Sequence, residues 1–82
     1  MKRVVFLKPA VAALRKHKAT SLRIREKIAA YAENLESLAN RVTELPGSSL
    51  KRLRIGDFRV LFEETATEII VTRIGPRGSV YD

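Results

Sequence analysis

The sequence predicts an α+β fold, because strand-like and helix-like segments follow one another in a separated order. A short β-branched segment opens the chain, two helix-like segments come next, and three alternating segments with very short connections close it. Connections too short for a crossover helix make neighbouring strands antiparallel. We therefore expect an N-terminal strand, a two-helix hairpin and a three-stranded antiparallel meander that forms one sheet, with helices on one face and the other face open.

The first half of the chain supplies the strand and the helices. Residues 3–7, RVVFL, are β-branched and aromatic, as is typical of a strand. Pro9 suits the first turn of a helix whose apolar side contains Val11 and Leu14. The segment Ala19-Thr20-Ser21 can cap a second, longer helix.

The second helix is predicted from a single apolar stripe at steps of 4, 3, 4, 3 and 4 residues. The stripe consists of Ile24, Ile28, Tyr31, Leu35, Leu38 and Val42. This spacing indicates a helix face that packs on the core, whereas a coiled coil would need a longer repeat. Asn34 and Asn40 both offer a residue at which the helix can stop.

The second half begins at Pro46-Gly47-Ser48-Ser49, the clearest break in the chain. Two short connections, Gly56-Asp57 and Glu64-Thr65-Ala66-Thr67, then divide the C-terminal half into three strand-like runs. These runs are Leu50–Ile55, Phe58–Glu63 and Glu68–Ile74.

Length and composition predict one globular domain over residues 1–82, with 45% hydrophobic and 30% charged residues. The chain has no cysteine, which excludes disulfides and thiolate metal sites and suits a reducing cytoplasm, the expected location. An apolar run near the N-terminus is broken at Lys8-Pro9, and no run approaches the ~20 residues of a membrane span. We expect a soluble protein without a membrane partner.

Charge indicates the class of partner. Sixteen Lys and Arg residues against nine Asp and Glu give a net charge of +7. Residues 1–27 contain nine basic residues and one acidic residue, Glu26. A small basic protein commonly binds nucleic acid, an anionic membrane surface or an acidic protein, and charge alone does not choose among them.

The hairpin LKRLRIGDFRVLF predicts an anion site. If Gly56-Asp57 is a two-residue turn, Arg54 lies opposite Arg59, and Arg52 shares their face. Lys51 falls on the other face by the same alternation. Like charges directly across two strands are destabilising, whereas a phosphate between guanidinium groups converts the repulsion into charge-assisted hydrogen bonds. The alternative is a solvated sheet face that is basic without a ligand.

Four stretches of the chain resemble the RelE/ParE superfamily of bacterial toxins from toxin–antitoxin pairs. They are VVFLKPAVAAL, LANRVTELPGS, LKRLRIGDFRVLFE and IIVTRIGPRGSVYD. The resemblance implies a toxin of a type II toxin–antitoxin system, with a cognate antitoxin as partner in a hetero-oligomer. RelE-like members are mRNA interferases that cut mRNA on the ribosome, and ParE-like members inhibit DNA gyrase without nuclease chemistry. We expect the endoribonuclease, with the gyrase inhibitor as the alternative.

Carried over by position, the nuclease site would consist of catalytic Arg59, Arg77 and Tyr81 and of RNA-binding or phosphate-binding residues Lys51, Arg52 and Arg54. The implied reaction is attack of the 2′-OH on the adjacent phosphate, without metal or small-molecule cofactor. The family's first-strand lysines are arginines here, and arginine is a poor proton carrier. The resemblance implies that Tyr81 acts as the base where neighbouring guanidinium groups favour its phenolate, while Glu44 and Glu63 remain open as proton acceptors. His17 is more readily explained as a helix-end residue.

Overall fold

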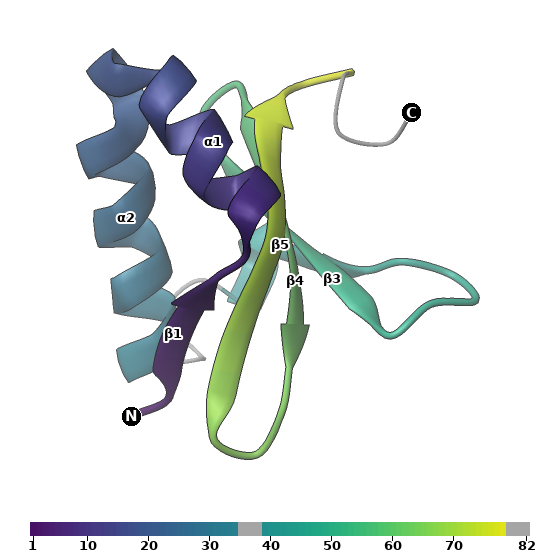
Figure 1. The fold of residues 1–82 in the computed structure, drawn as a ribbon. Coiled ribbons are helices and arrows are strands. Elements are labelled where there is room, and N and C mark those ends of the chain that lie inside the picture. Colours follow the sequence, from purple (N-terminus) through teal and green to yellow (C-terminus); the bar gives the residue numbers. More distant parts are fainter. Residues whose placement is uncertain (35–38, 79–82) are drawn as a thin grey trace.

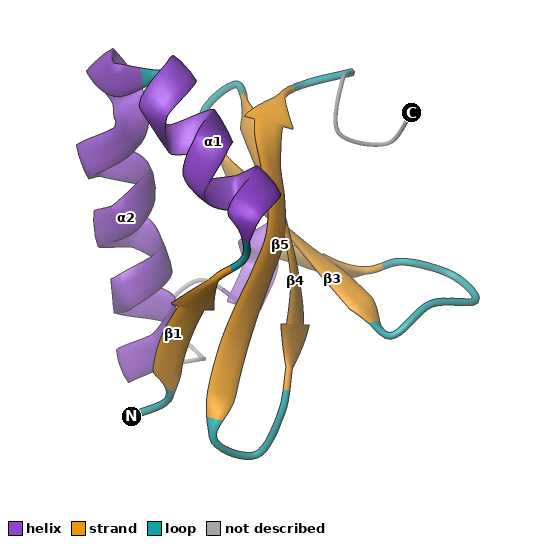
Figure 2. Cartoon of the chain, viewed as in Figure 1, coloured by secondary structure: helices purple, strands orange, loops and turns teal. Residues whose placement is uncertain are grey.

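The computed structural model describes residues 1–34 and 39–78. Its elements are β1 (Arg3–Phe6), α1 (Lys8–Lys16), α2 (Lys18–Glu33), a short 3-10 helix η1 (Ala39–Arg41), β2 (Val42–Glu44), β3 (Leu50–Ile55), β4 (Phe58–Glu64) and β5 (Glu68–Pro76). The strands form one sheet in the order β1-β5-β4-β3-β2. Strand β1 is parallel to β5, and the other neighbours are antiparallel. Both helices lie on the same side of this sheet (Figures 1 and 2).

The predicted α+β class and the meander β3-β4-β5 are confirmed. The sheet nevertheless has a further antiparallel strand, β2, which was not predicted from the sequence. Its residue Val42 was assigned to the helix stripe but pairs with Leu53 of β3. That assignment was wrong because α2 ends at Glu33, and Asn34 has extended dihedral angles (φ −142°, ψ 98°). The stripe positions Leu35 and Leu38 lie outside the described residues.

The helical hairpin turns at a single residue, His17, whose backbone N–H donates to the carbonyl of Ala13. The predicted cap at residues 19–21 is wrong, because α2 already begins at Lys18. The hydroxyls of Thr20 and Ser21 donate back to the carbonyls of His17 and Lys18, both at 3.2 Å. They therefore bond acceptors in the first turn and cap no backbone N–H.

The core lies between the helices and the covered face of the sheet. The stripe residues Ile24, Ile28 and Tyr31 are buried, as their spacing predicted. They meet the alternate residues of the central strands, and the ring of Tyr31 packs edge-on against Phe62 at 5.4 Å between centroids. The largest side chains with under 2% exposure are Phe62, Ile24, Ile28, Leu53, Ile69, Val60 and Val71. No helix in the described part of the chain is long and apolar enough to cross a membrane.

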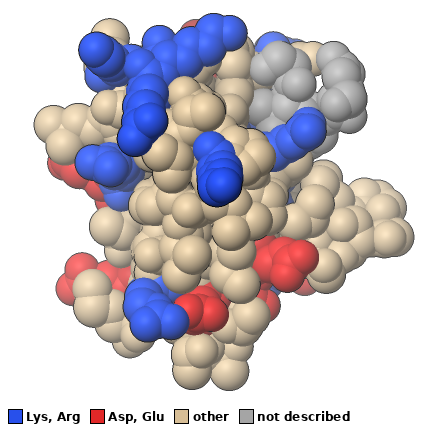
Figure 3. Space-filling model, viewed as in Figure 1, with Lys and Arg blue, Asp and Glu red and all other residues tan. Residues whose placement is uncertain are grey.

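Charged side chains are unevenly distributed over the surface. In Figure 3 most of the Lys and Arg surface lies over the upper half, where α1 meets α2, and most of the Asp and Glu surface lies over the lower half. Among the described residues, Glu68 forms an ion pair with Arg3, and Glu64 forms ion pairs with Lys2 and Lys51. Basic residues at the two ends of the molecule therefore have different surroundings.

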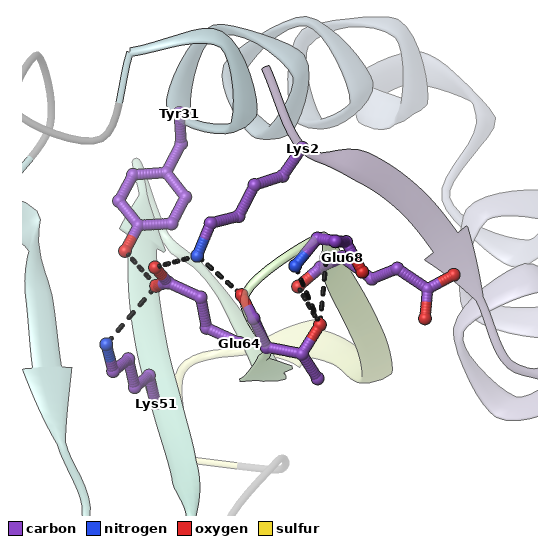
Figure 4. Close-up of polar contacts among 7 residues, drawn as sticks. Lys2, Tyr31, Lys51, Glu64 and Glu68 are labelled. Carbon is purple, nitrogen blue, oxygen red and sulfur yellow. Dashed lines mark hydrogen bonds and ion pairs between the residues drawn. The ribbon is translucent and has the colours of Figure 1, made fainter.

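Glu64 is the centre of a partly buried polar network (Figure 4). Its side chain is 10% exposed and points to the helix-covered face, two residues after Phe62. One carboxylate oxygen accepts from Lys2 Nζ at 2.7 Å, and the other accepts from the Tyr31 hydroxyl at 2.7 Å and from Lys51 Nζ at 3.2 Å. The network joins the start of the chain, α2, β3 and β4.

Burial by itself would raise the pKa of Glu64, but the hydrogen bonds from Lys2, Tyr31 and Lys51 outweigh burial and lower this pKa to about 2. Burial and the neighbouring Glu64 carboxylate raise the pKa of Tyr31, so its hydroxyl stays a proton donor. The carboxylate is thus ionised across the physiological pH range, and its negative charge compensates two ammonium groups.

We predict that acid weakens the fold through Glu64. Because the folded pKa, about 2, lies below the ordinary 4.5, the stabilisation is complete above roughly pH 5 and is lost as pH falls toward 2. Glu64→Gln should lower the free energy of unfolding by about 2–3 kcal/mol at pH 7, since two ammonium groups lose their counter-charge. Urea titrations at pH 7, 5, 3 and 2 measure this difference, which should shrink at the two lowest values.

The matched control is Glu63→Gln, which neutralises the adjacent, exposed carboxylate on the opposite face. It should change the free energy of unfolding by less than about 0.5 kcal/mol. A Glu64→Gln penalty that stays constant from pH 7 to pH 2 would contradict the predicted linkage.

Candidate nucleic-acid interface

The β3–β4 hairpin presents three arginines on the sheet face that the helices leave open. Its turn, Gly56-Asp57, needs a left-handed conformation, and Gly56 has φ +58°. The resulting register places Arg54 opposite Arg59 and Arg52 opposite Leu61, as predicted. Since core residues alternate with them, all three guanidinium groups belong to the uncovered face.

Arg77 joins these three from the end of β5. The strand ends at Pro76, and the backbone N–H of Arg77 donates to the carbonyl of Asp57 at 2.7 Å. This bond ties the start of the C-terminal segment to the hairpin turn. An open hollow of about 390 Å³, here called the arginine hollow, is lined by Arg52, Arg54, Arg59, Arg77 and Gly78.

The guanidinium of Arg59 is held at the turn by two backbone acceptors. Its Nη1 donates to the carbonyl of Gly56 at 3.2 Å and to that of Phe58 at 3.1 Å. Partial burial, together with the positive charges of Arg52, Arg77 and Arg54, lowers the pKa of Arg59, and only Asp57 acts in the opposite direction. The hollow is therefore a region of concentrated positive charge in which an anion would be stabilised.

One predicted site residue, Lys51, is not brought into this hollow. Lys51 lies opposite Phe62 on the helix-covered face, where its ammonium binds Glu64 at 3.2 Å. Its proposed phosphate-binding role therefore stays a prediction that this placement does not support. Tyr81 lies outside the described residues, and its role as the base also stays a prediction.

The other titratable candidates also lie away from the hollow. His17 packs its ring edge-on against Phe58, at 4.9 Å between centroids, on the helical side. Glu44 pairs with Lys51 across β2 and β3, in a row that belongs to the covered face. Glu63 shares the open face with Arg59 but is four residues further along β4, about 13 Å away.

Arg73, an exposed residue of β5 that shares the open face, was not among the predicted site residues. It lies opposite Leu61, so Arg52, Leu61 and Arg73 form one row across three strands. A bulge between Leu61 and Phe62 leaves Thr72 as the extra residue of β5, and its hydroxyl donates to the Leu61 carbonyl at 3.1 Å. The alternation of side chains between the two faces of the sheet is interrupted in β5 at this bulge. Ile74 is buried on the covered face, so its neighbour Arg73 could have been assigned to the open face from the sequence.

The lining of the hollow suits binding of a phosphodiester. Guanidinium groups offer forked donors to phosphate oxygens and stabilise negative charge that develops on them. Within residues 1–34 and 39–78, no group of three or more His, Cys, Asp and Glu side chains is arranged to hold a metal ion. A proton acceptor for catalysis would have to come from outside the described lining.

Comparisons with known proteins identify the family to which the chain belongs. The family model for the ParE toxin of the type II toxin–antitoxin system parDE matches residues 4–81. The fold is similar to that of the archaeal RelE–RelB complex from Pyrococcus horikoshii OT3, with a TM-score of 0.76 and 28% identity over 96% of this chain and 98% of that chain. It is also similar to the RelB–RelE antitoxin–toxin complex from Methanococcus jannaschii, with a TM-score of 0.70 and 29% sequence identity over 95% of each chain.

A more distant structure, YafQ from E. coli strain BL21(DE3), has a TM-score of 0.71 at 7% identity over the full length of both chains, which supports the fold alone. None of the curated protein sequences matches this chain. The family model nevertheless covers almost the whole chain, and the archaeal toxins are similar to it at the level of the whole fold. The chain belongs to the family of ParE toxins of type II toxin–antitoxin systems, within the RelE/ParE superfamily.

Proposed function

We propose that this toxin is an endoribonuclease that cuts mRNA on the ribosome and that the arginine hollow binds the scissile phosphate. The observation that carries the proposal is the convergence of Arg52, Arg54, Arg59 and Arg77 on one open hollow. Arg54 and Arg59 are direct cross-strand neighbours. Such like-charge pairs destabilise a sheet, so their presence is best explained by a polyanionic ligand.

The reaction that fits this lining is attack of an RNA 2′-OH on the adjacent phosphorus. A base removes the 2′-OH proton, the new P–O bond forms, and the bond to the 5′-oxygen breaks with protonation of that oxygen. The products are a 2′,3′-cyclic phosphate and a free 5′-OH. Arg52, Arg54 and Arg59 would stabilise the extra negative charge on phosphorus-bound oxygens in the transition state.

Arg77 and Tyr81 would complete the proton transfers. Arg77 lines the hollow and would bind the phosphate or assist protonation of the leaving oxygen. A tyrosine hydroxyl ordinarily has a pKa of about 10, so Tyr81 would act as a base where nearby guanidinium groups favour the phenolate. The ribosome would contribute by holding the mRNA with the 2′-oxygen in line with the leaving group, an effect worth several powers of ten.

A cognate antitoxin is the second expected partner. Solved structures that resemble this chain at 28% and 29% identity contain RelE bound to the antitoxin RelB. The net charge of +7 and the open basic face fit an acidic antitoxin segment that covers the hollow in a hetero-oligomer. A protein that acts on ribosomes would work in the cytoplasm, and the proposed chemistry uses no cofactor.

The alternative is a ParE-like inhibitor of DNA gyrase without nuclease activity. The match to the ParE family model favours it, because that model covers residues 4–81. In this case the arginine hollow would bind its target without chemistry.

Inducible expression in bacteria distinguishes the two functions. We predict growth arrest, together with new mRNA 5′ ends inside translated frames and unchanged plasmid supercoiling. Mapping of 5′ ends and plasmid topology in the same cells measures both readouts. Gyrase-linked DNA breaks without new mRNA ends would favour the alternative, and harmless expression at high level would refute both.

We predict that Arg59→Ala weakens binding of a short single-stranded RNA. The slope of log affinity against log salt concentration should also fall by about one, because one phosphate contact is lost. The RNA affinity of Arg59→Lys should lie between that of the wild type and that of Arg59→Ala, because lysine keeps the charge but loses the forked donors. Fluorescence anisotropy at several salt concentrations measures affinity and slope. Arg3→Ala is the control, since it removes an exposed arginine, paired with Glu68, from the other end of the same sheet face. Equal losses in both alanine variants would indicate diffuse charge.

We predict that Tyr81→Phe lowers mRNA cleavage on programmed ribosomes by roughly 10²-fold or more, the scale expected for a proton-transfer group. Ribosome binding should persist, because the phosphate-binding arginines remain. Single-turnover cleavage and a ribosome pelleting assay measure the two properties. An unchanged cleavage rate would remove Tyr81 from the chemistry and direct attention to Glu44 and Glu63.

A further inference from the structure

We propose that the helical hairpin forms a second RNA-binding surface that contacts the backbone of a double-helical RNA segment while the arginine hollow holds single-stranded mRNA. The surface consists of five exposed residues around the turn between α1 and α2, here called the hairpin cations. They are Arg15, Lys16, Lys18, Arg23 and Arg25. The proposal rests on the proposed function, because it extends the same RNA-binding activity to a second region.

The hairpin cations are not compensated within the fold. In the described residues, 1–34 and 39–78, none of the five forms an ion pair, whereas Lys2, Arg3 and Lys51 all bind carboxylates elsewhere. Glu26 is the one acidic residue among positions 1–27. Five like charges at the end of α1 and in the first half of α2 raise the local potential and attract a polyanion.

The hairpin cations are continuous with the arginine hollow through the β3–β4 turn. The guanidinium of Arg23 lies against this turn, since a Cβ on Gly56 would stand 3.7 Å from its Nη1. Arg59 reaches the same residue from the other direction, with Nη1 donating to the Gly56 carbonyl. A single turn residue thus touches one cation of each surface. Asp57 is the carboxylate at this junction.

The remaining hairpin cations extend the surface across α2 and toward α1. Lys18 and Arg25 lie two turns apart on one side of α2, about 10 Å along the helix axis. Together with Arg15 of α1 they line an open groove of about 330 Å³ between the helices. Arg23 lies on the other side of α2, next to the β3–β4 turn. Cations on both sides of one helix can contact more than one phosphate.

Double-helical RNA fits this surface better than a single strand. Non-specific single-strand binding uses aromatic side chains on which bases stack. The only aromatic residue within α1 and α2 is Tyr31, and it is buried against Phe62. A surface that offers cations without stacking groups can recognise the phosphates and shape of a duplex, as expected for double-helical RNA.

The test compares two variants with equal loss of charge. The hairpin variant carries Lys18→Gln, Arg23→Gln and Arg25→Gln, and the control carries Arg3→Gln, Lys8→Gln and Arg41→Gln, all at exposed positions. The probes are a 20-base-pair RNA duplex, a DNA duplex of the same sequence, a six-nucleotide single-stranded RNA and a glutamate-rich peptide. Anisotropy titrations at several salt concentrations give affinities and salt slopes.

The hairpin variant should bind the RNA duplex about tenfold or more weakly, with a salt slope lower by about two to three. It should bind the six-nucleotide RNA within twofold of the wild type, because the arginine hollow is intact. The control should stay within twofold for both probes. Equal losses in the two variants, an unchanged RNA duplex affinity, or tighter wild-type binding to the DNA duplex would each overturn the proposal. The proposal would also be overturned if the hairpin variant bound only the glutamate-rich peptide more weakly, because the surface would then bind a protein partner.

Arg59→Ala separates this proposal from the proposed function. If Arg59→Ala still binds the RNA duplex and the wild type does not cut mRNA, the proposed nuclease activity is refuted and the second RNA-binding surface is supported. If the wild type cuts mRNA but the hairpin variant binds the duplex normally, the nuclease stands and the second surface fails.

Discussion

The β3–β4 hairpin register is the constraint on which the rest of the molecule depends. Gly56 adopts a positive φ, the turn closes in two residues, and every side chain of the two central strands is thereby assigned to a face. Leu53 and Val60 enter the core, while Arg54 and Arg59 meet on the open face. A slip of one residue would bury the arginines and expose the core, so the apolar face holds the arginine pair in place.

Charge compensation divides the molecule into two regions. Glu64 neutralises Lys2 and Lys51 and thereby joins the first residues of the chain to the sheet and α2. At the other end, guanidinium groups are gathered around the β3–β4 turn, and their mutual repulsion contributes to the lowered pKa of Arg59. The stability supplied by the core and the Glu64 network can offset that repulsion, as is common for residues kept for binding.

In the proposed mechanism, phosphate binding and proton transfer come from different segments of the chain. The β3–β4 hairpin would supply forked donors that stabilise negative charge on a phosphate, and the guanidinium of Arg59 is held at its turn by two backbone carbonyls. The groups proposed to move protons come from the C-terminal segment, and Arg77 connects that segment to the hairpin through the Asp57 carbonyl. The helical hairpin reaches the same turn from the other side through Arg23. The turn is therefore the meeting point of the three chain segments that could contact RNA.

The sequence by itself determined the features that depend on short-range patterns. Alternation and a two-residue turn predicted the pairing of Arg54 with Arg59 and the opposite orientation of Lys51. Helical spacing predicted the burial of Ile24 and Ile28. Such patterns repeat every two or 3.6 residues, so a few neighbouring residues are enough to reveal them.

Only the tertiary structure decided which distant segments meet. Helix α2 ends before Asn34, so Val42 lies outside it and pairs with β3. A bulge in β5 places Arg73 on the open face of the sheet. Neither Glu64 as the partner of Lys51 nor Arg23 as a neighbour of the hairpin turn has a local sequence signal. Lys51 reaches Glu64 because β3 pairs with β4, and Arg23 reaches the turn because α2 packs on the sheet. Both contacts depend on how separate elements are brought together in space, which a repeat of two or 3.6 residues does not show.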